Sequence, residues 1–380
     1  MFPLSKRQFL RLAGLSIAGR VPWLRAEPSA RREKVILVTF GGGVRSTETF
    51  APEGLRNIPR LVELQPQGYF FRNCVNAGVL SHFNSTGSIL TGNWQRVDDF
   101  GMHPPASATI FEAYRKQRKA PPADAWVIAT NKSFAQIGAS SETSAGPNYG
   151  ANVVLPKQLL LDSVEAVVGS KKHESIADRD AVYRRLEGIL SEGYEGVGWT
   201  IFKAGRELDK QMRATLMRGL AEFINGPEAP TSGDELTFFI AREVMREFAP
   251  SLMLVNFWDM DVAHWGSYSL YLQAVTKTDR LTGMLWDEVQ SNPNYKDKTT
   301  LLILPELGRD GDINTANGFS NHRSGDASCR NVWMLALGGG IAKGETDRRV
   351  HHVDAAATAL ALLGVQPPSI AGVPVKELLL

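Results

Sequence analysis

The sequence predicts an α/β protein with a mostly parallel central sheet, helices on both faces and a helical insertion. One observation behind this prediction is a series of short apolar runs rich in β-branched residues, typical of strands buried on both faces of a parallel sheet. A second is that helical patterns separate these runs, and strands that alternate with helices favour parallel pairing. The runs lie at residues 34–40, 69–75, 125–129, 252–257, 299–304 and 332–337.

The clearest helix is predicted at residues 268–290. Its apolar side chains recur at intervals of four and seven residues, which places them on one face of a helix. That face needs a partner, and we expect it to pack on the sheet. The side chains expected on it are Leu270, Ala274, Leu281, Leu285 and Val289.

Residues 131–250 are predicted to form the helical insertion. The segment begins with a Ser/Gly-rich loop at residues 138–150 and continues with helical patterns at 181–190 and 207–224. Turn signals such as Asn225-Gly226-Pro227 punctuate it. The insertion is expected to form a layer beside the sheet, and a cap over the site is the alternative.

Residues 1–33 read as an export signal. A charged start around Lys6 and Arg7 precedes small and apolar residues up to Leu24, which is the layout of a signal peptide. The segment resembles a twin-arginine leader in which Lys6 replaces the first arginine, with cleavage near Ala26. An amphipathic N-terminal helix is the alternative, because arginines interrupt the apolar stretch. The export signal is favoured, and it places the mature domain (34–380) in the periplasm or otherwise outside the cytoplasm.

Composition argues against several classes of partner. The 42 basic and 40 acidic side chains nearly balance, and no basic run stands apart from acidic neighbours, so nucleic acid is not expected as a partner. No stretch after the leader reaches the roughly 18 apolar residues of a membrane span. A redox cofactor is not expected, because there is no Gly-x-Gly-x-x-Gly after a strand and no cysteine cluster. Cys74 and Cys329 are expected either to form a disulfide or to be buried free thiols.

Ligands of open parallel sheets bind outside the carboxyl ends of the strands. Residues of a functional site are therefore expected in the segments that follow the predicted strands. Asp259, Asp261 and His264 follow the fourth strand. Carboxylate oxygen and imidazole nitrogen together suit zinc, manganese or iron. The alternative is a capping cluster, since aspartates stabilise helix N-termini.

The fifth strand is followed by Glu306 and Arg309, and a polar, glycine-rich loop further on carries His322 and Arg323. His322 is a candidate metal ligand, with a solvated loop residue as the alternative. Arg309 and Arg323 are candidates for holding an anionic group through bidentate hydrogen bonds. Surface salt bridges are the equally weighted alternative for both arginines.

These segments, in this order, resemble the superfamily of alkaline phosphatases, sulfatases and nucleotide pyrophosphatases. The resemblance covers residues 34–129 and 252–380. Its most specific parts are Gly41-Gly42-Gly43 with Glu48-Thr49-Phe50, and Glu306-Leu307-Gly308-Arg309 with Asn321-His322. With the leader, they resemble a sulfatase-like branch of the superfamily. The other matching segments are residues 88–92, 259–264, 299–308, 353–365 and 372–374.

The resemblance implies two metal sites, one of which can be complete here. That site takes an Asp, a His and a later His, which correspond to Asp261 or Asp259, His264 and His322. The family spacing leaves three residues between the Asp and the first His. Here two residues separate Asp261 from His264, and four separate Asp259 from His264. Neither spacing matches, so both assignments stay open.

The second site implied by the resemblance lacks ligands. Its N-terminal Asp falls on Gly42 (or Gly41), and Leu307 replaces a His, while Glu306 can replace an Asp. The family nucleophile falls on His82. Ser85 and Thr86 are nearby hydroxyls that could serve if the register shifts.

These residues predict an exported, single-metal hydrolase of a phosphate or sulfate ester on a small molecule or glycan. One divalent metal (zinc, manganese or calcium) is expected, with Glu306 as a further ligand or as the base and with Arg309 holding the anion. The alternative is a catalytically disabled sulfatase-like protein that binds an anionic glycan or acts as a partner protein.

Overall fold

The computed structural model describes residues 34–97, 103–160, 208–225, 232–311 and 318–379. The predicted leader and the predicted helix at 181–190 lie outside these ranges. Within them, no helix combines the length and apolar character that crossing a membrane requires.

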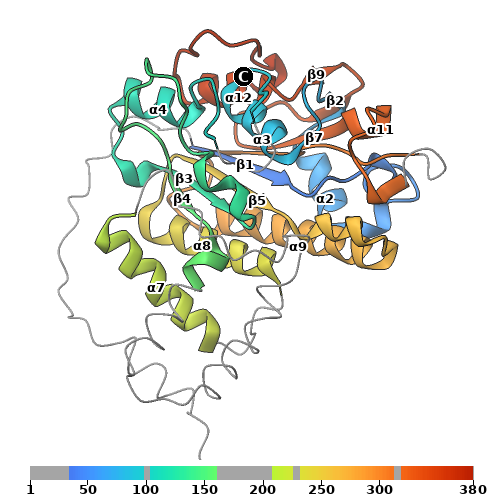
Figure 1. Cartoon of the computed structure of the whole chain (residues 1–380), viewed down its shortest axis with the longest axis horizontal. Coiled ribbons are helices and arrows are strands. Elements are labelled where there is room, and N and C mark those ends of the chain that lie inside the picture. Colours follow the sequence, from blue (N-terminus) through green and yellow to red (C-terminus); the bar gives the residue numbers. More distant parts are fainter. Residues whose placement is uncertain (1–33, 98–102, 161–207, 226–231, 312–317, 380) are drawn as a thin grey trace, which may run out of the picture.

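All six predicted strands belong to one mixed sheet (Figure 1). Its order is β4-β3-β5-β1-β6-β7-β2-β8, with β9 beside β2, and only β7 runs against its neighbours. The mostly parallel α/β prediction is therefore confirmed. The strands are β1 (Lys34–Phe40), β2 (Tyr69–Val75), β3 (Ala125–Ala129), β4 (Asn152–Val154), β5 (Leu252–Phe257), β6 (Thr299–Pro305), β7 (Asn331–Gly338), β8 (Gly344–Thr346) and β9 (Val350–His351).

The three central strands end level with one another. Phe40, the last residue of β1, lies opposite Phe257 of β5 and Pro305 of β6. All three strands are parallel, so the segments that follow them leave the sheet at the same edge. This places the residues after Phe40, Phe257 and Pro305 next to one another.

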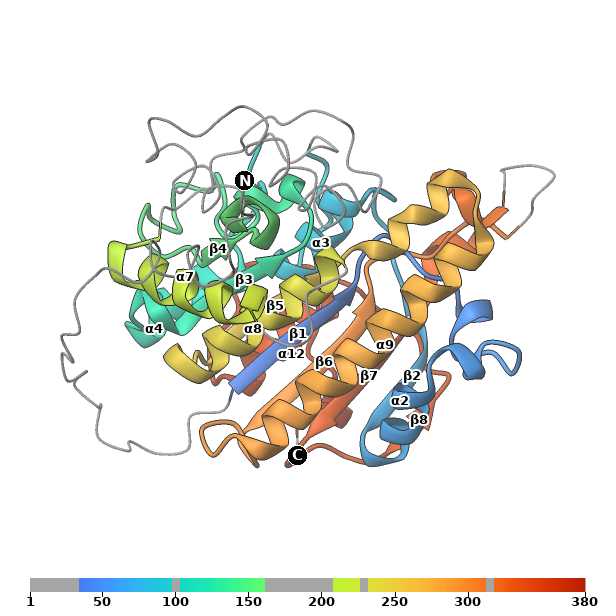
Figure 2. The ribbon, with the colours of Figure 1, turned by 90° about the horizontal axis from the view of Figure 1, so that it is seen from below.

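Side chains of β1 alternate between two hydrophobic cores, because successive residues of a strand point to opposite faces. Ile36 and Val38 belong to one core, and Val35 and Leu37 to the other. Helices cover both faces, as Figures 1 and 2 show. The first core takes α2 (Pro59–Leu64), α7 (Lys210–Asn225), α8 (Gly233–Phe248) and α9 (Tyr268–Ser291). The second takes α3 (His82–Thr91), α4 (Ile110–Arg118) and α12 (Asp354–Leu362).

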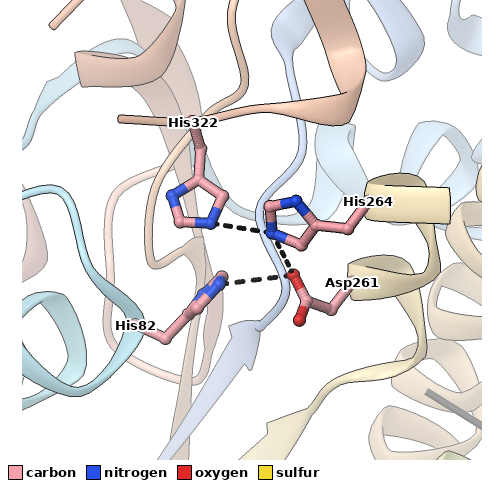
Figure 3. A group of neighbouring side chains, drawn as sticks. All are labelled: His82, Asp261, His264 and His322. Carbon is pink, nitrogen blue, oxygen red and sulfur yellow. Dashed lines mark hydrogen bonds and ion pairs between the residues drawn. The ribbon is translucent and has the colours of Figure 1, made fainter. Parts of the chain in front are cut away.

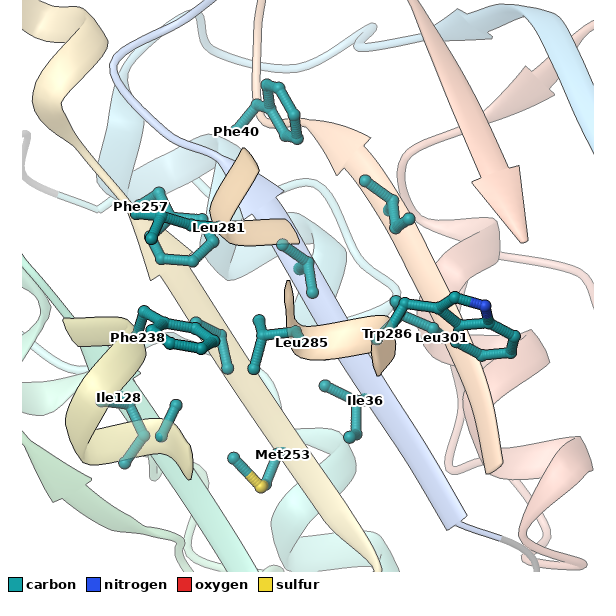
Figure 4. Packing of buried hydrophobic residues seen from close by; sticks show 14 of the residues in the cluster. Ile36, Phe40, Ile128, Phe238, Met253, Phe257, Leu281, Leu285, Trp286 and Leu301 are labelled. Atoms are coloured by element: carbon teal, nitrogen blue, oxygen red, sulfur yellow. The ribbon is translucent and has the colours of Figure 1, made fainter. Parts of the chain in front are cut away.

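Helix α9 confirms the predicted long helix, and it packs along the sheet with Leu281, Leu285 and Trp286 facing strands β1, β5 and β6 (Figure 4). The prediction was wrong at Leu270, which is 41% exposed. Leu270 lies in the first turn, and the buried face of the helix begins one residue later at Tyr271.

The predicted insertion is only partly helical. Helix α7 confirms the pattern at 207–224, and α8 forms a layer on β3 and β5. The favoured layer is thus observed for α8. However, β4 adds a parallel strand to the main sheet beside β3, so the prediction of a loop followed by helices was wrong there. Three residues are too few to show a strand period in the sequence.

The alternative of a disulfide is wrong, because Cys74 and Cys329 are both free and buried. Cys74 lies in β2, and Cys329 lies in the short helix α11 (Ala327–Arg330). The Cys329 thiol donates a hydrogen bond to the Asp310 carboxylate.

Candidate metal centre

Four side chains converge at the carboxyl edge of the sheet: His82, Asp261, His264 and His322 (Figure 3). One potential ligand atom from each lies within 4.8 Å of the others. His82 is the first residue of α3, and Asp261 and His264 belong to the 3₁₀ helix η6 (Asp259–Trp265) that follows β5. His322 comes from the loop before α11. The group therefore joins segments that are distant in sequence.

The spacing of the four side chains suits a metal ion. The Asp261 Oδ1 atom lies 3.3 Å from His82 Nε2 and 3.1 Å from His264 Nε2. The Nε2 atoms of His264 and His322 lie 3.1 Å apart. Four ligands placed about 2.1 Å from a central zinc would be about 3.4 Å from one another in a tetrahedron. Three imidazoles and one carboxylate are also the donor types that zinc accepts.

The 3₁₀ conformation of η6 explains why Asp261, and not Asp259, joins the group. A 3₁₀ helix has three residues per turn, so side chains at i and i+3 lie above one another. Asp261 and His264 have this spacing. The alternative ligand Asp259 points elsewhere and forms an ion pair with Lys277 at 3.0 Å.

A buried carboxylate that the sequence analysis missed holds η6 in place. Asp234, in α8, accepts hydrogen bonds from the backbone N–H groups of Trp258 and Asp259, at 2.6 and 2.9 Å. Thr130 donates to the same carboxylate at 2.7 Å. These bonds anchor the start of η6 to the helical layer and so fix the position of Asp261.

Glu306 orients the His82 imidazole by contacting the ring nitrogen that does not face Asp261. Its Oε1 atom lies 2.5 Å from His82 Nδ1, which leaves His82 Nε2 directed at Asp261. Burial lowers the pKa of His82, but the carboxylates of Asp261 and Glu306 outweigh it and raise the pKa to about 9. Without a metal, the proton therefore stays on this imidazole. A metal at Nε2 would compete with that proton.

Glu306 lies outside the group of four potential ligands, and its predicted roles as ligand or base stay predictions. It has no exposed surface. Besides His82 it accepts hydrogen bonds from Gly42 N–H at 2.9 Å and from the Thr86 hydroxyl at 2.7 Å. One of its bonds thus goes to a member of the group, His82, and the others go to Gly42 and Thr86. Glu306 is a positioning residue.

The predicted hydroxyls are also turned away from the centre. Thr86 donates to Glu306, and Ser85 donates to Val79 O at 3.3 Å while accepting from Asn76 Nδ2 at 2.8 Å. Both side chains are buried. His82 itself occupies the position expected of the nucleophile, and its geometry is that of a metal ligand. The sequence signal for it was only that position at the start of α3.

Arg309 balances charge and does not face the solvent, which corrects its predicted role of holding a substrate anion. It is fully buried, and its guanidinium donates to Gly43 O, Phe319 O and Gly42 O. It also forms an ion pair with Asp261 Oδ1 at 2.9 Å. Burial raises the pKa of Asp261, but His82, His264 and Arg309 hold it well below its ordinary value. Asp261 is therefore ionised, as a ligand must be.

Burial and the positive charges of His82 and Arg309 lower the pKa of His322. Its imidazole is therefore neutral near pH 7, which is the form that coordinates a metal. Arg323, the next residue, is exposed and lines a cleft together with Arg96 and Arg330.

Gly42 and Leu307 stand at positions where the resemblance implied ligands of a second metal. Gly42 has φ +78°, and a Cβ atom there would lie 2.4 Å from Asp261 N. No larger residue, an aspartate included, fits at this position without moving the backbone. Leu307 is buried against Leu80 and Cys329. These two positions thus carry no side chain that could bind a metal.

A scan of protein-family models and a search of the curated proteins gave no match. Solved structures do match. The wild-type alkaline phosphatase PafA is 12% identical, with a TM-score of 0.54 over 93% of this chain and all of that one. The lipoteichoic acid synthase LtaP from Listeria monocytogenes is 11% identical, with a TM-score of 0.53 over 98% of this chain and 82% of that one.

The phosphonate monoester hydrolase SpPMH from Silicibacter pomeroyi is 12% identical, with a TM-score of 0.52 over 91% of this chain and 76% of that one. At such low identity the likeness concerns the path of the chain. It extends over nearly the whole sequence in all three comparisons. The chain therefore has the fold of the alkaline phosphatase superfamily.

Proposed function

We propose that this protein is a hydrolase of a phosphate or sulfate ester and uses one divalent metal held by His82, Asp261, His264 and His322. The observation that carries the proposal is the convergence of these four side chains at the carboxyl edge of the sheet. The fold supports it, because similar structures include an alkaline phosphatase and a phosphonate monoester hydrolase.

The donor set favours zinc, with manganese as the next choice. Calcium prefers six to eight oxygen ligands, and three imidazoles offer none, so the donor set argues against it. A bound divalent metal supplies Lewis acidity, which polarises the phosphoryl or sulfuryl group of an ester. One metal per chain is proposed because neither Gly42 nor Leu307 has a side chain that could ligate a second metal.

The protein residues have separable tasks in this proposal. Glu306 holds the proton on His82 Nδ1 and so directs Nε2 to the centre. Arg309 compensates the charge of Asp261. His264 has the most exposed side chain of the four, at 20%, and marks the side from which an ester arrives. Because Ser85 and Thr86 bond to other protein groups, we propose direct transfer of the phosphoryl or sulfuryl group to water. The bond from phosphorus or sulfur to the ester oxygen breaks, and the alcohol is released with a proton from that water.

A second candidate function is binding without turnover. The absence of ligating side chains at Gly42 and Leu307 favours it, because two metals normally share the neutralisation of the attacking and leaving oxygens. In this case the site around the four potential ligands binds an anionic glycan, or the protein acts as an assembly partner.

Elemental analysis and turnover separate the two candidates. We expect about one zinc or manganese per chain and hydrolysis of an aryl phosphate or an aryl sulfate by the loaded protein. His264→Ala should lose both, and His103→Ala, an exposed histidine outside the group, should lose neither. Metal without turnover of either ester favours the binding function. A chain that takes up no metal rules out the proposed hydrolase.

We also propose that residues 1–33 direct export to the periplasm. The charged start followed by an apolar stretch supports this. Expression of the full chain in a bacterium followed by fractionation tests it. Arg7→Ala should retain the protein in the cytoplasm, and an equal periplasmic yield for both forms would contradict the proposal.

A further inference from the structure

We infer that the substrate carries a second anionic group, a sulfate or phosphate apart from the ester that is cleaved. The inference rests on the proposed function for the nature of the substrate. Its basis is a cleft of about 460 Å³ beside the metal centre, lined by Arg96, Arg323 and Arg330 together with residues 77–81.

Two residues that line the cleft are direct neighbours in sequence of two residues of the centre. Ser81 lines the cleft and directly precedes His82, and Arg323 lines it and directly follows His322. Neighbouring Cα atoms are about 3.8 Å apart. A single substrate molecule can therefore contact both places, with its cleaved ester at the histidines and another substituent in the cleft.

The charge of the cleft is concentrated and positive. Its three arginines come from separate segments: the chain after α3, the loop after His322, and the end of α11. No residue that lines it among the described ranges is acidic. An anion in the cleft would lie near three guanidinium groups, which attract it. Guanidinium groups bind sulfate and phosphate oxygens through paired hydrogen bonds.

Part of the cleft is preorganised, because hydrogen bonds hold one of its arginines in place. Arg330 Nη1 donates to Asn76 O at 3.1 Å and to Gly78 O at 3.0 Å, which fixes its side chain along the wall. Ser81 is the N-cap of α3, and its side chain does not cap the helix amides. The positive end of this helix therefore adds to the attraction for an anion.

The walls between the arginines are apolar. Ala77, Val79 and Leu80 line the cleft, and Val79 is 39% exposed. A carbon skeleton between two anionic groups can pack against such residues. The class that fits is a small ester whose alcohol part bears a further sulfate or phosphate, such as a doubly sulfated disaccharide or a sugar bisphosphate.

Calorimetry on metal-free protein tests the cleft without requiring activity. After a chelator has removed any metal, the parent protein should bind inorganic sulfate or inorganic phosphate. The anion with the higher affinity identifies the second anionic group of the substrate. Arg96→Gln should weaken that binding at least tenfold, and Arg330→Gln should do the same if it folds. Arg72→Gln, a surface arginine paired with Glu345, should have no effect. Unchanged anion affinity in both cleft variants would overturn the inference.

Kinetics then connects the cleft to the substrate. For the loaded enzyme, we expect kcat/KM to be at least tenfold higher for a disulfated than for a monosulfated disaccharide, or for the corresponding phosphates. Arg96→Gln should reduce this ratio toward one while the metal content stays the same. A ratio of one in the parent would overturn the inference even though hydrolysis occurs. If no ester is hydrolysed but Arg96→Gln abolishes anion binding, the hydrolase proposal fails and the anion cleft stands.

Discussion

Glu306→Gln tests the role of the carboxylate behind His82. The change keeps the size and the hydrogen-bonding shape of the side chain but removes its charge. A glutamine oxygen can still accept from Gly42 N–H and His82 Nδ1, which lie 2.9 and 2.5 Å from Glu306 Oε1. The fold should therefore persist, while His82 becomes a poorer ligand because its partner is neutral.

Loss of such a supporting carboxylate typically weakens metal binding about 10- to 100-fold. This corresponds to about 1.4–2.7 kcal/mol of binding free energy. At a free metal concentration of about 100 times the parent Kd, the metal adds about 2.7 kcal/mol to the free energy of unfolding. In Glu306→Gln that increment should fall to between about 1.4 and about 0.4 kcal/mol.

Two measurements check this expectation. Competition with a coloured chelator gives the zinc Kd, and urea unfolding with and without zinc gives the increment. Because the increment is a difference within each variant, a change in the stability of the metal-free protein does not affect it. Glu63→Gln, a surface carboxylate that pairs with Arg60, is the control. A zinc Kd within threefold of the parent, in a protein folded by circular dichroism, would refute the supporting role of Glu306.

Three further predictions follow from buried groups. Gly42→Ala should destabilise the protein by at least about 1–3 kcal/mol and reduce its metal content, since both the backbone angle and the contact with Asp261 N oppose a Cβ. Gly340→Ala is the control, because Gly340 has a similar φ of +82° but open space around a Cβ, so it isolates the cost of the backbone angle. Equal melting temperatures for the two variants would rule out a cost from the contact with Asp261 N. Burial, with His351 nearby, lowers the pKa of His352 to about 3, so the unfolded chain binds one more proton between pH 6.5 and about 3. Stability should therefore fall by about 1.6 kcal/mol from pH 6.5 to pH 5, and urea unfolding of His352→Leu should show a smaller fall. An identical fall in both proteins would contradict the assignment. Finally, Ser85→Ala should retain most ester turnover, whereas removal of an essential nucleophile costs several orders of magnitude in kcat.

Much of the fold could be predicted from the sequence because the central strands are buried on both faces. A run such as residues 34–40 then contains almost only apolar, β-branched side chains, and this signal is local. The parallel arrangement also predicted where the chemistry would lie. Asp261, His264 and His322 were candidates on that ground, and the structure brings them together.

Several features depended on contacts between distant parts of the chain. His82 and Glu306 are separated by 224 positions, and only the packing of α3 against the end of β6 makes them partners. The choice of Asp261 over Asp259 required the 3₁₀ turn of η6. The strand β4 was missed because its three residues acquire a strand conformation through pairing with β3.

The arginines show the same division most clearly. Arg309 and Arg323 are alike in sequence as cations near a candidate site, yet one is sealed beneath Asp261 and the other lines an open cleft with Arg96 and Arg330. Residue type and spacing determined which strands form and which side chains can bind a metal, since both follow from local chemistry. Burial and the direction of each side chain depend on the assembled fold, and these decided whether an arginine supports the centre or lines the cleft.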